Sequence, residues 1–126
     1  MRGVRISYII FGILFSQNSF GANYQVKMND RDSAGNRFVF DKEILSISSG
    51  DSITWLPVDK VHNIEMVASP NNLKFSSSAE EEVTLKFEVP GIYYYKCIPH
   101  KSAGMIGLVI VDSDYSNIEQ IKSANA

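Results

Sequence analysis

Four side chains that can donate to a soft metal ion stand out in this sequence. Cys97, His100 and Met105 lie within nine residues of one another in the spacing C-x2-H-x4-M, and His62 is the only other histidine. Together they offer a thiolate, two imidazoles and a thioether. Soft sulfur donors with imidazoles select copper, and two His with one Cys and a weak axial Met are typical of electron-transfer copper sites. The set therefore predicts one copper ion bound by His62, Cys97, His100 and Met105.

Each of these residues also has a plainer interpretation. A lone cysteine is often a buried core residue, and Met105 taken alone could be a core methionine. A structural zinc site needs four Cys, His or carboxylate ligands, but no acidic residue lies between Cys97 and Met105. Cys97 and His100 could form a nucleophile and its base, although this would leave Met105 without a role. The complete set of four favours the metal site, and we expect no catalytic residues.

The loop that carries three of the donors lies between two predicted strands. Residues 83–89 alternate apolar and polar side chains strictly, as a half-buried strand does, and Pro90-Gly91 then predicts a turn. The aromatic β-formers of residues 92–97 and the apolar run 105–111 predict the strands before and after the loop. Cys97 should end one strand and Met105 should begin the next, so that the loop lies at one end of the fold.

His62 must come to this loop from an earlier part of the chain. It opens a predicted strand over residues 62–67 and shares its parity with Ile64 and Met66. Because alternate side chains of a strand point to the same face, His62 should point inward with these two residues.

The rest of the chain predicts an all-β sandwich with one terminal helix. Seven or eight short strands with closely spaced turn signals favour an antiparallel sandwich or a closely related barrel. Residues 117–124 predict a short helix that Ser116 or Asn117 can cap, with Ile118 and Ile121 on one face. The remaining predicted strands cover residues 24–28, 38–40, 44–47 and 52–56.

Residues 1–21 have the pattern of a signal peptide. Arg2 and Arg5 precede an apolar stretch over residues 6–15, and small residues follow it, which favours cleavage after Gly21 or Ala22. The apolar stretch is too short for a transmembrane helix, which needs about 18 or more residues. We therefore expect an exported single domain over residues 22–126, without a membrane anchor after cleavage.

Composition agrees with an exported metal protein. Exported proteins usually pair their cysteines, yet this chain has a single one. Loss of residues 1–21 would move the formal net charge from −2 to −4, because it removes two arginines. A mildly acidic domain lacks the dense basic face that nucleic-acid binding requires.

At these residues the sequence closely resembles the pseudoazurins, small type-1 blue copper proteins of the cupredoxin family, which also includes plastocyanin. The resemblance implies a Greek-key β-sandwich of about eight strands and a monomeric periplasmic electron carrier that cycles between Cu(II) and Cu(I). It also implies redox protein partners, with a reductase such as copper nitrite reductase as acceptor and a cytochrome as possible donor. Its most specific segments are residues 50–55, 57–63, 90–93 and 97–105.

The resemblance further implies roles for residues around the copper. Asn63 would brace the site by hydrogen bonding near the thiolate, and His100 would be the exit for the electron. A mostly apolar docking patch would surround His100, with Pro57, Pro99, Ala103 and Phe38 as candidates.

Two features depart from the family pattern. Pseudoazurins usually have many lysines around this patch, whereas this domain is acidic and offers Lys60, Lys74, Lys96 and Lys101 for a local basic rim. Its C-terminal tail has room for only one helix. The main alternative is a periplasmic copper-binding or copper-delivery module on the same fold, which would need a more accessible site.

Overall fold

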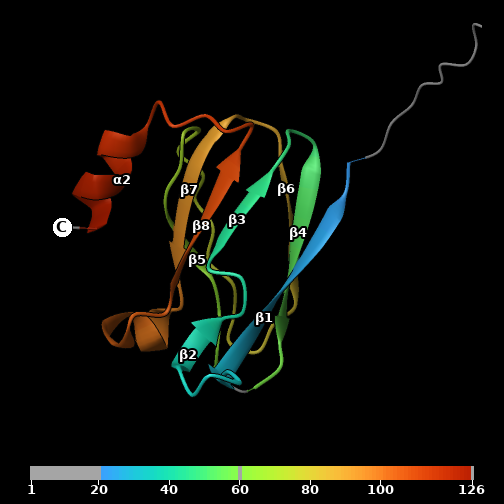
Figure 1. Ribbon diagram of the computed structural model, residues 1–126, viewed down its shortest axis with the longest axis vertical. Helices are drawn as coiled ribbons and strands as arrows, with labels where there is room; N and C mark the ends of the chain where they lie inside the picture. Colours follow the sequence, from blue (N-terminus) through green and yellow to red (C-terminus); the bar gives the residue numbers. More distant parts are fainter. Residues whose placement is uncertain (1–20, 60, 126) are drawn as a thin grey trace, which may run out of the picture.

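The computed structural model describes residues 21–59 and 61–125. The predicted signal peptide therefore lies outside the described residues, apart from Gly21. The described chain forms two four-stranded sheets packed face to face, with one short helix near each end of the sandwich (Figure 1). The elements are β1 (Asn23–Arg31), β2 (Arg37–Phe40), β3 (Ile44–Ile47), β4 (Asp51–Pro57), β5 (Glu65–Ala68), β6 (Val83–Phe87), β7 (Gly91–Lys96), the 3-10 helix η2 (Ile98–Ala103), β8 (Ile106–Val111) and α2 (Ile118–Asn125).

The strand orders confirm the predicted all-β sandwich. One sheet has the order β2-β1-β4-β6, and the other has the order β3-β8-β7-β5. The pairing is not antiparallel throughout, because β1 pairs with β4 and β3 pairs with β8 in parallel. Side-chain alternation predicts which face of a strand is buried but carries no information on the direction of its neighbour. Connections that cross between the sheets bring strands of the same direction together.

The core lies between the sheets and reaches the end of the sandwich that carries η2. Its aromatic centre is Trp55, whose ring packs edge-on against Tyr95 with 5.2 Å between ring centroids. Strand β7 is buried on both faces, because Tyr93 and Tyr95 face this core while Ile92 and Tyr94 join a second apolar cluster.

Helix α2 covers the outer face of β7. The buried Ile121 packs against the second cluster, as predicted, whereas Ile118 is 38% exposed. The side chain of Asn117 does not act as the predicted helix cap on the backbone. Its Oδ1 accepts from the Ile92 N–H (2.9 Å) and its Nδ2 donates to the Ile92 carbonyl (2.9 Å), so it fastens the helix to β7.

Helix η2 and α2 lie at opposite ends of the molecule. In Figure 1 the orange η2 is at the lower end, beside β2 and the end of β1, and α2 is at the upper left. The four predicted metal donors come from the end that carries η2. Neither helix of the described ranges has the length and hydropathy to cross a membrane.

Candidate metal centre

Three of the four predicted donors meet at one point. One possible ligand atom from each of His62, Cys97 and His100 lies within 4.8 Å of the other two. The Cys97 Sγ atom is 3.8 Å from His62 Nδ1 and 3.5 Å from His100 Nδ1. Cys97 and His62 have no exposed surface, whereas His100 is only partly buried. The two imidazoles therefore turn the same nitrogen toward a shared buried sulfur.

His62 is buried as its parity predicted, but it does not belong to a strand. The ladder of β5 begins only at Glu65, so the predicted strand start at residue 62 was wrong. The segment before the strand is held by other contacts: the Glu80 N–H donates to the His62 carbonyl at 2.9 Å, and the Ser77 N–H donates to the Ile64 carbonyl at 2.9 Å. A neighbouring loop replaces the missing ladder partner and fixes the backbone at His62.

Helix η2 brings Met105 back to the cysteine. Pro99 stands at its start, and Gly104 ends it at φ 90°, a left-handed conformation that glycine adopts without a side-chain clash. The Cys97 N–H then donates to the Met105 carbonyl (3.0 Å), and the Met105 N–H donates to the His100 carbonyl (3.2 Å). Met105 is 1% exposed. Strand β7 ends one residue before Cys97, and strand β8 begins one residue after Met105. Both residues therefore belong to the loop and not to the strands.

Asn63 connects the two segments that carry the donors. Its Oδ1 accepts from the N–H of Ile98, the residue after Cys97, at 2.8 Å, and its Nδ2 donates to the Ser77 carbonyl at 3.1 Å. The side chain is 4% exposed. This contact lies beside the thiol, where the family resemblance implied a bracing role.

Burial governs the protonation of the site. It raises the pKa of the Cys97 thiol, and backbone hydrogen bonds from Asn63 and His100 oppose that shift in part. Burial also lowers the pKa of His100, the positive charge of a protonated His62 lowers it further, and Asp30 opposes both effects. At neutral pH without a metal, the thiol is therefore protonated and His100 is neutral. A metal that binds here must displace the thiol proton.

Phe38 forms a stack with the partly buried His100. Its ring lies parallel to that of His100, with 4.1 Å between centroids and 6° between planes. The guanidinium of Arg37 lies 4.8 Å from the centroid of the Phe38 ring. Phe38 adopts a φ of 55°, and Val61, next to His62, adopts 64°. Left-handed backbone is costly for such residues, and strain of this kind tends to occur at functional sites.

Two charged residues at this end of the sandwich, Asp30 and Arg37, were not among the predicted site residues. The Asp30 carboxylate lies 2.7 Å from His62 Nε2. Its parity with Val26 and Met28 could have indicated an inward-facing side chain at the end of β1. Nothing in the local sequence marks Arg37, because its place over Phe38 depends on the turn between β1 and β2.

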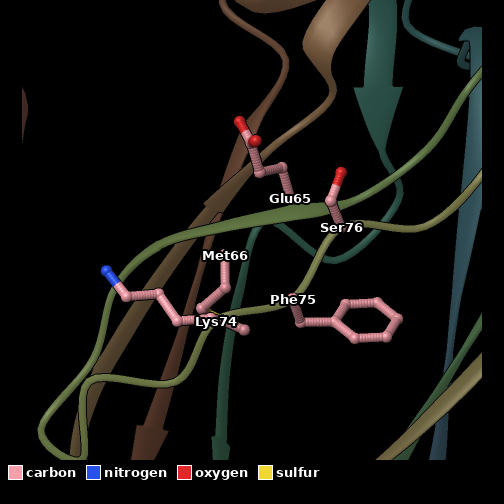
Figure 2. Close-up of a pocket in the computed structure, with 5 residues that line it drawn as sticks. All are labelled: Glu65, Met66, Lys74, Phe75 and Ser76. Atoms are coloured by element: carbon pink, nitrogen blue, oxygen red, sulfur yellow. The ribbon is translucent and has the colours of Figure 1, made fainter.

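The predicted basic rim is incomplete among the described residues. Lys96 pairs with Glu65 at 3.3 Å, and Lys60 lies outside the described part of the chain. Lys74 lines a pocket of about 510 Å³ that contains none of the predicted donors; Figure 2 shows its side chain pointing away from Phe75. Lys101 is exposed in the last turn of η2.

The donor chemistry of the site fits copper. A buried thiol, two imidazoles that turn Nδ1 toward it, and a buried thioether in the same loop as the thiol are the groups that a type-1 copper centre uses. Among the described residues, no carboxylate joins the cluster of His62, Cys97 and His100 as the further ligand that a structural zinc site would need.

The comparisons with known proteins agree with this assignment. A model of the plastocyanin/azurin family of copper-binding proteins matches residues 25–112. A putative pseudoazurin of Rhizobium leguminosarum bv. viciae is 38% identical over 106 residues, which cover 82% of this chain and 69% of that protein. The pseudoazurin of Paracoccus pantotrophus is 35% identical over 108 residues, covering 83% of this chain and 74% of that protein.

Solved structures give the same result. The crystal structure of pseudoazurin from Methylobacterium extorquens AM1 superposes with a TM-score of 0.74 at 36% identity, covering 80% of this chain and 84% of that one. These proteins transfer electrons and are not enzymes. The chain belongs to the plastocyanin/azurin family of copper-binding proteins, as a pseudoazurin-like cupredoxin that carries electrons.

Proposed function

We propose that His62, Cys97, His100 and Met105 bind one copper ion, and that the protein carries electrons in the periplasm to a reductase such as copper nitrite reductase. The observation that carries this proposal is the convergence of three donor atoms within 4.8 Å. When bound, copper supplies the one-electron Cu(II)/Cu(I) couple. The four side chains leave no position for a substrate, which favours electron transfer over catalysis.

The residues of the site divide into buried donors and one surface contact. Cys97, His62 and Met105 are shielded from water, which protects the thiolate from oxidation and keeps the site rigid. His100 is only partly buried and is the most exposed of the four, so it offers the shortest route to a partner protein. We assign the electron exit to this residue.

An apolar surface around His100 supports transient docking. Pro99 and Ala103 on η2 are exposed, and Phe38 and Pro57 are half-buried. Exposed apolar patches mark interaction sites on soluble proteins. The positively charged Arg37 and Lys101 flank the patch and would steer an acidic partner, which affects the rate of encounter more than the affinity. Further exposed apolar side chains at the loops that carry the donors are Val58, Val61 and Ile98.

Loading with Cu(II) tests the metal assignment. The full chain, expressed with export and purified, should take up one copper and develop the intense visible colour of a copper–thiolate bond. Cys97→Ser should abolish the colour, because the serine oxygen cannot form that soft covalent bond. A colourless adduct of the unsubstituted protein would refute the type-1 site. Retained colour in the Cys97 variant would show that another group binds the metal.

Electron-transfer kinetics test the partner. Reduced protein should pass electrons to copper nitrite reductase, and the rate should fall as salt rises if Arg37 and Lys101 steer the encounter. Fast transfer to cytochromes with none to nitrite reductase would overturn the choice of acceptor. Rapid loss of copper to a chelator would instead favour the alternative of a delivery module, which the burial of Cys97 and His62 argues against.

Export to the periplasm rests on the N-terminal sequence. Arg2, Arg5 and the apolar residues 6–15 have the pattern of a signal peptide. Mass spectrometry of the protein from a periplasmic extract should give an N-terminus at Ala22 or Asn23. Recovery of the uncleaved chain from the cytoplasm would contradict this proposal.

A further inference from the structure

Asp30 stands where strand β1 reaches the donor cluster. Along this strand Val26 and Met28 point into the core and are fully buried. Asp30 continues the same parity, but its side chain is 54% exposed because the strand ends at the edge of the sandwich. An inward-facing carboxylate therefore lies at the end of β1, between the buried core and the donor cluster.

The two ring nitrogens of His62 face different groups. Nδ1 lies 3.8 Å from the Cys97 sulfur, and Nε2 lies 2.7 Å from Asp30 Oδ1. A carboxylate accepts a hydrogen bond, so it holds the proton of the neutral imidazole on Nε2. This leaves the Nδ1 lone pair free, on the side where the other donors converge.

The backbone that carries Asp30 is held in place by the loop that follows β4. The Asp30 N–H donates to Asp59 Oδ2 at 2.7 Å, and the Asp59 N–H donates to the Met28 carbonyl at 3.3 Å. Asp59 thus binds the end of β1 at two points on either side of residue 29. The backbone position of Asp30 is therefore fixed by the fold, and from this position its carboxylate reaches His62 Nε2.

We propose that Asp30 is a positioning residue that fixes the ring and tautomer of His62 and lowers the reduction potential of the site. Hydrogen bonding to a carboxylate makes the imidazole a stronger donor, and outer partners of this kind change metal affinity by about 10–100-fold. A negative charge near the metal also favours the more positive oxidised state. Since Asp30 is half-exposed, we expect the lower end of that range. This inference rests on the proposed function, because it assumes that His62 binds copper through Nδ1.

Two substitutions separate the charge from the hydrogen bond. Asp30→Asn keeps an oxygen acceptor and removes the charge, so it should shift the equilibrium toward the reduced form by about tenfold, which is about 59 mV for a one-electron couple. Asp30→Ala removes both and should in addition speed the loss of copper by about tenfold. Asp32→Asn is the matched control: it removes a charge two residues away, where the carboxylate serves the 32–36 turn and not His62.

The experiment measures reduction potentials of the copper-loaded full chain by spectroelectrochemical titration, and the imidazole tautomer of metal-free His62 by 15N NMR. The proposal requires an Nε2-protonated ring that loses this preference in Asp30→Ala and keeps it in Asp30→Asn. It is overturned if Asp30→Asn changes the equilibrium by less than twofold, or if Asp32→Asn shifts it equally. A colourless unsubstituted protein would refute the proposed copper site, whereas the NMR comparison would still decide whether Asp30 positions the ring.

Discussion

Substitution of Asn63 by alanine tests whether the donor segments depend on their shared side-chain bridge. The change would leave the Ser77 carbonyl and the Ile98 N–H without their partner. An unsatisfied buried group costs about 1–3 kcal/mol. Ser77 is buried, so its carbonyl should lie in the upper part of that range, whereas the exposed Ile98 allows water to reach its N–H. We therefore expect a loss of about 2–4 kcal/mol in the free energy of unfolding.

Asn117→Ala provides a matched control at the opposite end of the sandwich. Asn117 also makes two hydrogen bonds to backbone groups, both with Ile92, but it is only partly buried. Water can replace its side chain, so this variant should lose about 1–2 kcal/mol and keep the copper spectrum of the unsubstituted protein.

Urea unfolding of the metal-free protein, followed by the fluorescence of its single tryptophan Trp55, measures both effects. The midpoint for Asn63→Ala should fall by about 1–2 M urea, and its copper-loaded form should show a shifted visible band. The reasoning is refuted if Asn63→Ala costs no more than Asn117→Ala, or if the bands of the two variants coincide.

Three further predictions concern Met105, the ring that stacks on His100 and the response to acid. Met105→Leu should alter the colour and raise the reduction potential of the copper-loaded protein. The volume-matched core change Met66→Leu should lower the free energy of unfolding by less than about 1.5 kcal/mol and leave the colour and the potential unchanged. Equal spectra for the two variants would remove Met105 from the ligand set. Phe38→Leu should lose a stack worth about 0.5–1.5 kcal/mol and move the NMR signals of the His100 ring, and unmoved signals would contradict the stack. The hydroxyl and N–H of Ser49 lower the pKa of Asp112, so this carboxylate stabilises the fold above its ordinary pKa, and the contribution disappears as pH falls through the lowered folded-state value. Thermal melts should therefore show a smaller loss of stability on acidification for Asp112→Asn than for the unsubstituted protein, and an unchanged acid response would show that the contact does not matter.

Much of the fold could be predicted because strand patterns are local. The alternation over residues 83–89 appears in the structure as the buried Val83 and Phe87 of β6, although the strand ends at Phe87 and Val89 is 38% exposed. The three consecutive tyrosines predicted a strand, but not that both of its faces would be buried. That result depends on α2, whose Ile121 covers the outer face. The pairing of strands was harder to predict. The parallel neighbours of β1 and β8 come from distant segments, and the sequence of a single strand does not indicate which strand lies beside it.

The sequence by itself determined the donor types and the metal they select, because the chemistry of a thiolate, two imidazoles and a thioether belongs to the side chains. The short spacing from Cys97 to Met105 also determined that three donors share one loop. Tertiary structure alone decided that His62 reaches a cysteine 35 residues away, that Phe38 stacks on His100, and that Asp30 holds the far side of the His62 ring. Each of these contacts joins separate strands or loops, so it exists only once the two sheets have packed and the chain has closed around the end of the sandwich.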